Sequence, residues 1–148
     1  MERKYNVIFS MSLAVILIDQ LSKFFVRTNF QLNQSIPIIN NIFHLTYIQN
    51  TGAGFGILKS QALILIFISV AVIGIILYNF DKIKNKETLL QIFVAFVIGG
   101  TIGNIIDRIA YGYVIDFLDF QIWPIFNFAD SFVTIGVTGL IIYLWKKG

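Results

Sequence analysis

Four of the eight acidic residues in this apolar chain lie in the stretch from Gly99 to Asp130. They are Asp107, Asp116, Asp119 and Asp130. Carboxylates beside membrane-length apolar runs are costly, so each needs a reason to be there. When two carboxylates share a site, one keeps a proton. The charged one can then activate water while the protonated one donates to a carbonyl oxygen. Asp116 and Asp130 are therefore interpreted as a catalytic aspartate pair.

The spacing of this pair leaves a second interpretation open. On one continuous helix the two residues would stand roughly 20 Å apart, and Pro124 between them argues against such a helix. They can meet if Asp116 comes from a loop and Asp130 from the first turns of the next helix. Alternatively, Asp130 only supports the start of that helix and Asp116 only a turn. Asp119 is interpreted as a solvated surface charge.

Three polar pairs recur near the ends of apolar runs: Asp19 with Lys23, Asn104 with Arg108, and Asn127 with Asp130. Residues three or four positions apart lie on the same face of a helix. One such pair is ordinary as an ion pair or a cap, and for Asp19 with Lys23 that structural role remains open. Three pairs at one membrane face indicate a polar site.

Other chemistries have less support in the sequence. The chain has no cysteine, which excludes thiolate metal sites and cysteine nucleophiles. The only histidine, His44, lies in a predicted strand and is interpreted as a surface residue. Serine–lysine catalysis has two candidates, Ser22-Lys23 and Lys59-Ser60, but neighbouring side chains point apart in a regular helix. We expect no metal, no cofactor and no nucleic-acid partner.

The elements that must position these residues are membrane helices. Hydrophobic residues make up 57% of the chain and charged residues 13%, against roughly a quarter charged in soluble domains. The 148 residues form one predicted domain with four transmembrane helices over residues 7–25, 62–80, 89–106 and 126–145. Between the first two helices, residues 28–60 are more polar and include an alternating pattern, which predicts a small β-rich element.

Basic residues set the predicted orientation. Seven fall on the side of the termini: Arg3, Lys4, Lys82, Lys84, Lys86, Lys146 and Lys147. The positive-inside rule then places both termini in the cytoplasm. The β-rich segment and the aspartates share the outer face of the membrane.

Together these motifs resemble bacterial lipoprotein signal peptidase, also called signal peptidase II. Five blocks match in order: Asp19-Gln20 with Lys23, Asn50-Thr51-Gly52-Ala53, Gly103-Asn104-Ile105-Ile106-Asp107-Arg108, Val114-Ile115-Asp116-Phe117, and Phe126-Asn127-Phe128-Ala129-Asp130. Each block alone is weak, whereas five in order with this predicted topology are specific.

The resemblance implies an aspartyl endopeptidase of the bacterial cytoplasmic membrane. It implies cleavage of signal peptides from prolipoproteins just before a cysteine that carries a diacylglyceryl group. Asp116 and Asp130 match the catalytic positions, and Asn50, Asn104, Arg108 and Asn127 match the polar residues around the site. Asp19 and Lys23 match a supporting block. The implied fold is a four-helix bundle with an extracytoplasmic β-cradle, and we expect a monomer in contact with membrane lipids.

The chain departs from the family pattern in three places. Gly54 stands where alanine is common, Gln49 where a basic residue is common, and the interval between the two aspartates is short. The competing class of function is a small transporter or channel subunit that uses outer-face carboxylates. Transporters place such groups near the midplane between repeats, and no repeat is visible here. A membrane anchor would explain the helices but not the aspartates.

Overall fold

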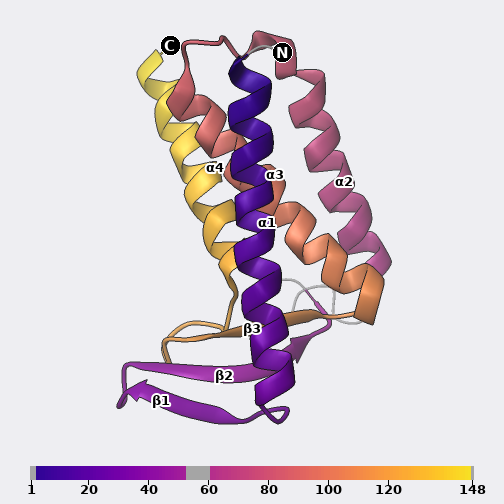
Figure 1. Cartoon of the computed structure of the whole chain (residues 1–148), viewed down its shortest axis with the longest axis vertical. Coiled ribbons are helices and arrows are strands. Elements are labelled where there is room, and N and C mark those ends of the chain that lie inside the picture. The colour runs from indigo at the N-terminus through magenta and orange to yellow at the C-terminus, as the bar shows by residue number, and fades with distance from the viewer. Residues whose placement is uncertain (1–2, 53–60, 148) are drawn as a thin grey trace.

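Four apolar helices and a small sheet make up the computed structural model, which describes residues 3–52 and 61–147 (Figure 1). In chain order the elements are α1 (Arg3–Asn29), β1 (Ser35–Ile39), β2 (Phe43–Asn50), α2 (Ala62–Tyr78), the 3-10 helix η2 (Phe80–Lys82), α3 (Thr88–Tyr111), β3 (Val114–Asp119) and α4 (Phe128–Lys147). The helices form a bundle, and the sheet lies across one end of it.

The helices agree in number with the four predicted spans. In the described part of the chain, α1, α3 and α4 are long and apolar enough to cross a membrane, and α2 is a shorter apolar helix. α1 and α3 continue as helices beyond the predicted ends of their apolar runs. The first two residues of the segment predicted to be β-rich are therefore helical.

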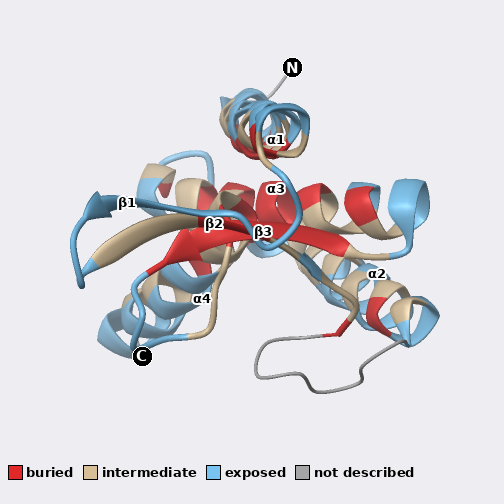
Figure 2. Ribbon diagram, turned by 90° about the horizontal axis from the view of Figure 1, so that it is seen from below, coloured by how far each residue is buried: buried red, intermediate tan, exposed pale blue. Residues whose placement is uncertain are grey.

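α3 is the central helix of the bundle, and it packs against α1 on one side and α4 on the other. Figure 2 shows buried positions along much of its length. Glycines allow both contacts to be close. A Cβ on Gly99 would lie 2.8 Å from the carbonyl oxygen of Ser12 in α1, and one on Gly100 would lie 2.5 Å from that of Ala129 in α4. Small residues at such contacts let membrane helices approach closely.

The sheet is antiparallel, in the order β1-β2-β3. β3 was not predicted, because residues 114–119 lie far from the polar segment that was expected to form strands. Gly112 ends α3 in the left-handed conformation (φ 79°) and reverses the chain. This brings Val114 opposite Asn50 in the register of β2. Asp116 therefore lies in a strand, and its predicted placement in a loop was wrong.

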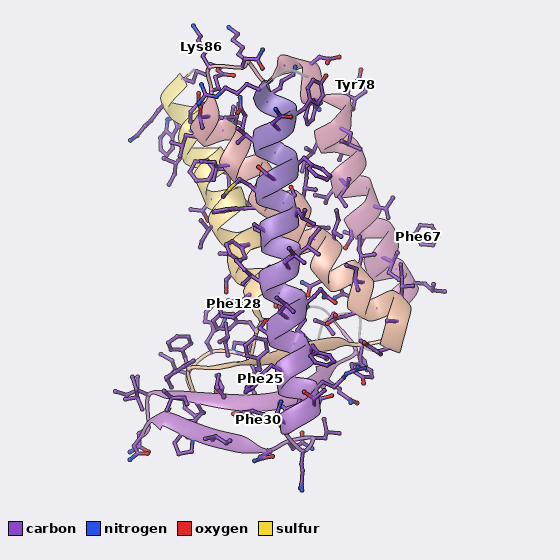
Figure 3. All side chains as sticks on the ribbon, viewed as in Figure 1. Phe25, Phe30, Phe67, Tyr78, Lys86 and Phe128 are labelled. Atoms are coloured by element: carbon purple, nitrogen blue, oxygen red, sulfur yellow. The ribbon has the colours of Figure 1, made fainter. Side chains whose placement is uncertain are left out.

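β3 is buried along its whole length (Figure 2). Ile115, Phe117 and Leu118 pack with Val26 of α1 and Tyr47 of β2 into an apolar cluster. Figure 3 shows Phe128, at the start of α4, between the bundle and the sheet. The cluster fixes the sheet against the helix ends.

The interpretation of Asp119 as a solvated charge was also wrong. Its side chain is buried, and its two carboxylate oxygens accept hydrogen bonds from the Thr46 hydroxyl (2.7 Å) and the Gln121 backbone N–H (2.9 Å). Gln121 has a positive φ of 65°, and the carboxylate stabilises this turn after β3.

The opposite end of the bundle holds both termini and the connection between α2 and α3 (Figure 1). Lys86 lies at this end (Figure 3). An ion pair between Glu87 and Lys147 joins the start of α3 to the end of α4 there. The charged end and the sheet end are therefore separated by the length of the bundle.

The contact at Gly100 predicts a large difference between two glycine-to-alanine changes. In Gly100→Ala the new methyl group would meet the backbone of Ala129, so α3 and α4 must separate. We expect destabilisation of about 1–3 kcal/mol and a lower Tm in detergent. Gly74→Ala on α2 is the control, since a Cβ there has no neighbour within 4 Å. Equal melting temperatures for Gly100→Ala and the parent protein would contradict the close contact.

Candidate active site

A cavity of about 250 Å³ lies between the ends of α3 and α4, the strands β2 and β3, and the segment before α4. Its polar side chains are Asn50, Asn104, Arg108, Asp116, Asp130 and Thr134. Its apolar wall is formed by Val114, Trp123, Pro124, Ile125, Phe126 and Val133. Residues from five separate segments thus converge on one small polar space.

Asp116 lies in the buried strand β3 and lines this cavity, and it is only 1% exposed. Its two carboxylate oxygens accept hydrogen bonds from the side-chain amides of Asn50 (2.9 Å) and Asn127 (2.7 Å). Burial raises the pKa of Asp116 to about 7, and the nearby charge of Asp130 adds to this, against the lowering effect of the two amides. Burial favours the neutral acid because it removes water from the charged form.

Asp130 reaches the same cavity from the first turn of α4. Its backbone N–H donates to the side-chain oxygen of Asn127 (2.8 Å), and the Asn127 backbone N–H donates to its carboxylate (3.4 Å). This reciprocal pairing is a capping box. The second carboxylate oxygen accepts from Asn104 (2.8 Å). Asp130 therefore supports the start of α4, which was the alternative role considered from the sequence. It also faces the cavity.

Asn127 connects the two aspartates. It is completely buried, and its side-chain N–H group lies 2.7 Å from Asp116 and 3.1 Å from the side-chain oxygen of Asn104. Its side-chain oxygen is occupied by the N–H of Asp130. Asn127, which directly precedes α4, thus positions Asp116 through its side chain and Asp130 through both its backbone and its side chain.

A buried lysine lies behind the cavity. Lys23 of α1 lies 2.8 Å from Asp19 and 3.1 Å from Asp107, and all three residues are at most 1% exposed. The same ammonium group donates to the side-chain oxygen of Asn104 (3.0 Å). Because that oxygen faces Lys23, the amide nitrogen of Asn104 faces Asp130.

The two carboxylates of this cluster also bind backbone N–H groups. Asp19 accepts from Ala129 at the start of α4 (2.9 Å), and Asp107 accepts from Ile115 in β3 (2.9 Å). Ala129 is next to Asp130, and Ile115 is next to Asp116. The cluster therefore holds the two elements that carry the candidate catalytic groups.

Sequence reasoning gave no role to Asp107 or Gln20, although both lie in the matched blocks. The Gln20 amide donates to Asp107 (3.0 Å) and to the carbonyl of Gly103 (3.1 Å), which links α1 to α3. The sequence spacing does not show that a second carboxylate lies opposite Lys23. Asp107 is brought to that position only by the packing of α1 on α3.

Arg108 contributes a positive charge to the cavity wall. Its guanidinium group donates to the carbonyl oxygens of Asn104 (3.4 Å) and Gly52 (3.3 Å). The backbone N–H of Gly52 in turn donates to the side chain of Asn50 (2.9 Å). Arg108 thus ties the end of β2 to α3 beside Asp116.

Five of the eight predicted site residues line the cavity: Asn50, Asn104, Arg108, Asp116 and Asp130. Asn127 does not line it but hydrogen-bonds to both aspartates. Asp19 and Lys23 do not line it and act through Asn104 and the start of α4. The serine–lysine alternative has no support at Ser22, whose hydroxyl donates to the backbone of Asp19. Lys59-Ser60, Gly54 and the end of the Asn50–Ala53 block lie outside the described residues. Among residues 3–52 and 61–147, no group of three His, Cys, Asp or Glu side chains is arranged to bind a metal.

This arrangement, a helix bundle of membrane-spanning character with a carboxylate-lined cavity at its sheet end, matches known proteins along nearly its whole length. The family model described as signal peptidase (SPase) II matches residues 11–146, so the chain belongs to the signal peptidase II family. It is 46% identical to the lipoprotein signal peptidase of Halothermothrix orenii, over 95% of this chain and 97% of that protein. It is also 46% identical to that of Moorella thermoacetica, over 92% and 89% of the two chains.

Two solved structures described as bacterial membrane enzymes have the same fold. The first is 31% identical in sequence, with a TM-score of 0.87, and the match covers 99% of this chain and 93% of that one. The second is 30% identical, with a TM-score of 0.88, and the match covers 99% of this chain and 97% of that one. The four-helix fold with a small sheet, as predicted from the sequence, is confirmed.

Removing the buried cation should destabilise the protein strongly. Lys23→Met keeps an unbranched side chain of similar length but leaves Asp19 and Asp107 without their counter-ion. Breaking a buried ion pair in this way costs about 3–5 kcal/mol, so we expect a large fall in Tm in detergent. Lys82→Met, on the exposed helix η2, is the control and should change Tm little. A small effect of Lys23→Met would mean that the cluster does not hold α4 and β3.

Proposed function

We propose that this protein is an aspartyl endopeptidase that removes signal peptides from prolipoproteins, with Asp116 and Asp130 as its catalytic pair. Membership of the signal peptidase II family and the relatives named lipoprotein signal peptidase support the reaction. The observation that carries the catalytic type is the position of the two carboxylates in one cavity, joined through Asn127. The proposed cleavage point lies before a cysteine that bears a diacylglyceryl group.

The pair hydrolyses the peptide bond by general acid–base catalysis. The charged carboxylate takes a proton from water, whose oxygen attacks the carbonyl carbon, while the neutral carboxyl group protonates the carbonyl oxygen. The tetrahedral intermediate then collapses, the carbon–nitrogen bond breaks, and the leaving amine takes up a proton from the pair. Burial raises the pKa of Asp116 to about 7, so the pair can hold the shared proton at the start of the cycle.

The surrounding amides and the guanidinium group orient the pair and the substrate. Asn50 and Asn127 hold Asp116, and Asn104 holds Asp130. A signal-peptide helix must unwind at the scissile bond, because its amides are otherwise engaged in helical hydrogen bonds. Arg108 has five N–H donors, and we assign it to hold the carbonyl groups of the unwound segment.

The transporter alternative receives no comparable support. The carboxylates lie at the sheet end of the bundle, away from its middle, and the chain belongs to a peptidase family. The proposed enzyme acts in the bacterial cytoplasmic membrane, as a monomer in contact with membrane lipids.

Amide replacement of either aspartate should abolish cleavage. Asp116→Asn and Asp130→Asn keep nearly the same volume but remove the ionisable group, so neither variant can complete proton transfer. We expect the rate of cleavage of a lipidated prolipoprotein, measured by gel analysis, to be at least a hundred-fold lower. Both variants should still be folded in detergent. Asp119→Asn is the matched control, because Asp119 is also buried in β3 but does not line the cavity. Near-normal turnover by either cavity variant would refute the aspartyl mechanism.

The raised pKa of Asp116 predicts a loss of activity in alkaline solution. As the pH rises through about 7, the pair loses its shared proton and cannot protonate the carbonyl oxygen. The rate should therefore fall above pH 7, with apparent pKa values that belong to the pair. A group whose pKa is raised by folding also loses its stabilising contribution as pH rises through the folded value. Tm should therefore fall between about pH 4 and 7 in the parent protein and less in Asp116→Asn. A cleavage rate that does not fall above about pH 7 would contradict the assignment.

We also propose that both termini face the cytoplasm and that the cavity lies near the outer face. The support is the group of seven basic residues at the end of the bundle that holds the termini, away from the sheet. A reporter fused after Lys147 should read as cytoplasmic, and one inserted near Asn41, in the turn between β1 and β2, as extracytoplasmic. The reverse pattern would place the cavity on the wrong side.

A further inference from the structure

A second concave surface adjoins the catalytic cavity and is larger, at about 540 Å³. Four residues line both spaces: Trp123, Phe126, Asp130 and Thr134. Its other side chains are contributed by Phe120, Ile122, Ser131 and Ile135. We call this surface the loop groove, since it lies between the loop of residues 120–126 and the first turns of α4. One continuous surface therefore leads from Asp130 to the outer side of α4.

The loop that forms one wall is held firmly at both ends. Leu118 and Phe126 exchange backbone hydrogen bonds of 2.8 and 3.1 Å. The ring of Phe120 stacks on that of Phe126, with 5.9 Å between centroids, and contacts that of Phe43 at 4.9 Å. Asp119 fixes the turn at Gln121. The conformation of the loop is therefore set by the sheet below it.

Despite this anchoring, the tip of the loop exposes large apolar side chains. Ile122 is 94% exposed and Trp123 is 59% exposed. On the opposite wall, Ile135 of α4 is 52% exposed. Such exposure is unfavourable in water, whereas tryptophan is common where membrane proteins meet the interface of the bilayer. These side chains are placed to contact hydrocarbon.

We propose that the loop groove binds an acyl chain of the diacylglyceryl group on the substrate cysteine. This inference rests on the proposed function, because it names the part of the substrate that lies beside the scissile bond. The cysteine follows that bond directly, so its lipid leaves the cavity close to the two aspartates. The loop groove is the apolar surface that shares Asp130 and Thr134 with the cavity.

The size of the groove favours a thin chain over the signal-peptide helix. A helix with side chains is about 10–12 Å wide and rises 5.4 Å per turn, so one turn fills roughly 420 Å³ or more. The groove would hold little more than one turn. On α4 it extends only from Asp130 to Ile135. An extended acyl chain fits such a space and can continue along α4 into the bilayer.

The first experiment measures cleavage of two substrates by the full-length protein in detergent. The substrates carry either two palmitoyl or two octanoyl chains on the cysteine. Ile135→Trp fills the groove without changing a residue that lines the catalytic cavity. We expect it to raise KM for the palmitoyl substrate about ten-fold, to leave kcat within two-fold, and to reduce the preference for long chains. Ile141→Trp is the control, because Ile141 is 60% exposed on the same helix but lines neither space.

Two outcomes of this experiment overturn the proposal in different ways. If Ile135→Trp impairs the long-chain and short-chain substrates equally, the groove holds peptide and not lipid. If Ile135→Trp behaves like Ile141→Trp while the parent protein cleaves and Asp116→Asn does not, the groove is unused and the proposed function still stands.

A second experiment detects binding without cleavage. A substrate with a photoreactive diazirine in one palmitoyl chain is added to the Asp116→Asn variant, and the cross-linked residues are identified by mass spectrometry. We expect cross-links at Ile122 and Ile135 that persist in excess dipalmitoylphosphatidylcholine vesicles. Cross-links confined to α1 or α2 would overturn the proposal. Loss of the cross-links in the presence of the vesicles would also overturn it, since the groove would then bind bilayer lipid in general.

Discussion

The site depends on one buried ammonium group. Lys23 lies between Asp19 and Asp107 in the interior of the bundle, where an unpaired charge would be very unfavourable. Lys23 serves as the counter-ion of both carboxylates, and each carboxylate also accepts a hydrogen bond from a backbone N–H group, Asp19 from α4 and Asp107 from β3. The ion cluster therefore determines where α1, α3, α4 and the sheet meet. The cavity lies at that junction.

The side-chain amides of Asn104 and Asn127 connect this cluster to the two aspartates. The side-chain oxygen of Asn104 is committed to Lys23 and Asn127, which leaves its N–H group for Asp130. Asn127 is committed in the same way, with its oxygen on the N–H of Asp130 and its N–H group on Asp116. Neither amide can turn over without breaking several hydrogen bonds. The aspartates therefore face fixed donors, as preorganised sites for charged transition states require.

Much of this could be predicted from the sequence, for physical reasons. Long apolar runs predict membrane helices, and spacings of three or four residues placed Asn104 with Arg108 and Asn127 with Asp130 on common faces. β3 was missed because Val114 to Asp119 forms a strand only through pairing with β2, more than sixty residues away. Asp107 was missed because its partner, Lys23, lies on another helix. The cavity wall at Trp123 was missed for a similar reason, since the shape of the loop depends on contacts with the sheet.

The bridge between Leu118 and Phe126 has a consequence for how such enzymes diverge. It closes the loop at its base, so that Asp116 lies on one side of the closure and Asn127 with Asp130 on the other. Residues between the two closing positions can be inserted, deleted or exchanged without displacing either aspartate. The fold thereby separates the positions of the two carboxylates from the loop side chains that line the cavity and the loop groove, so that these side chains can differ among related enzymes while the carboxylates stay in place.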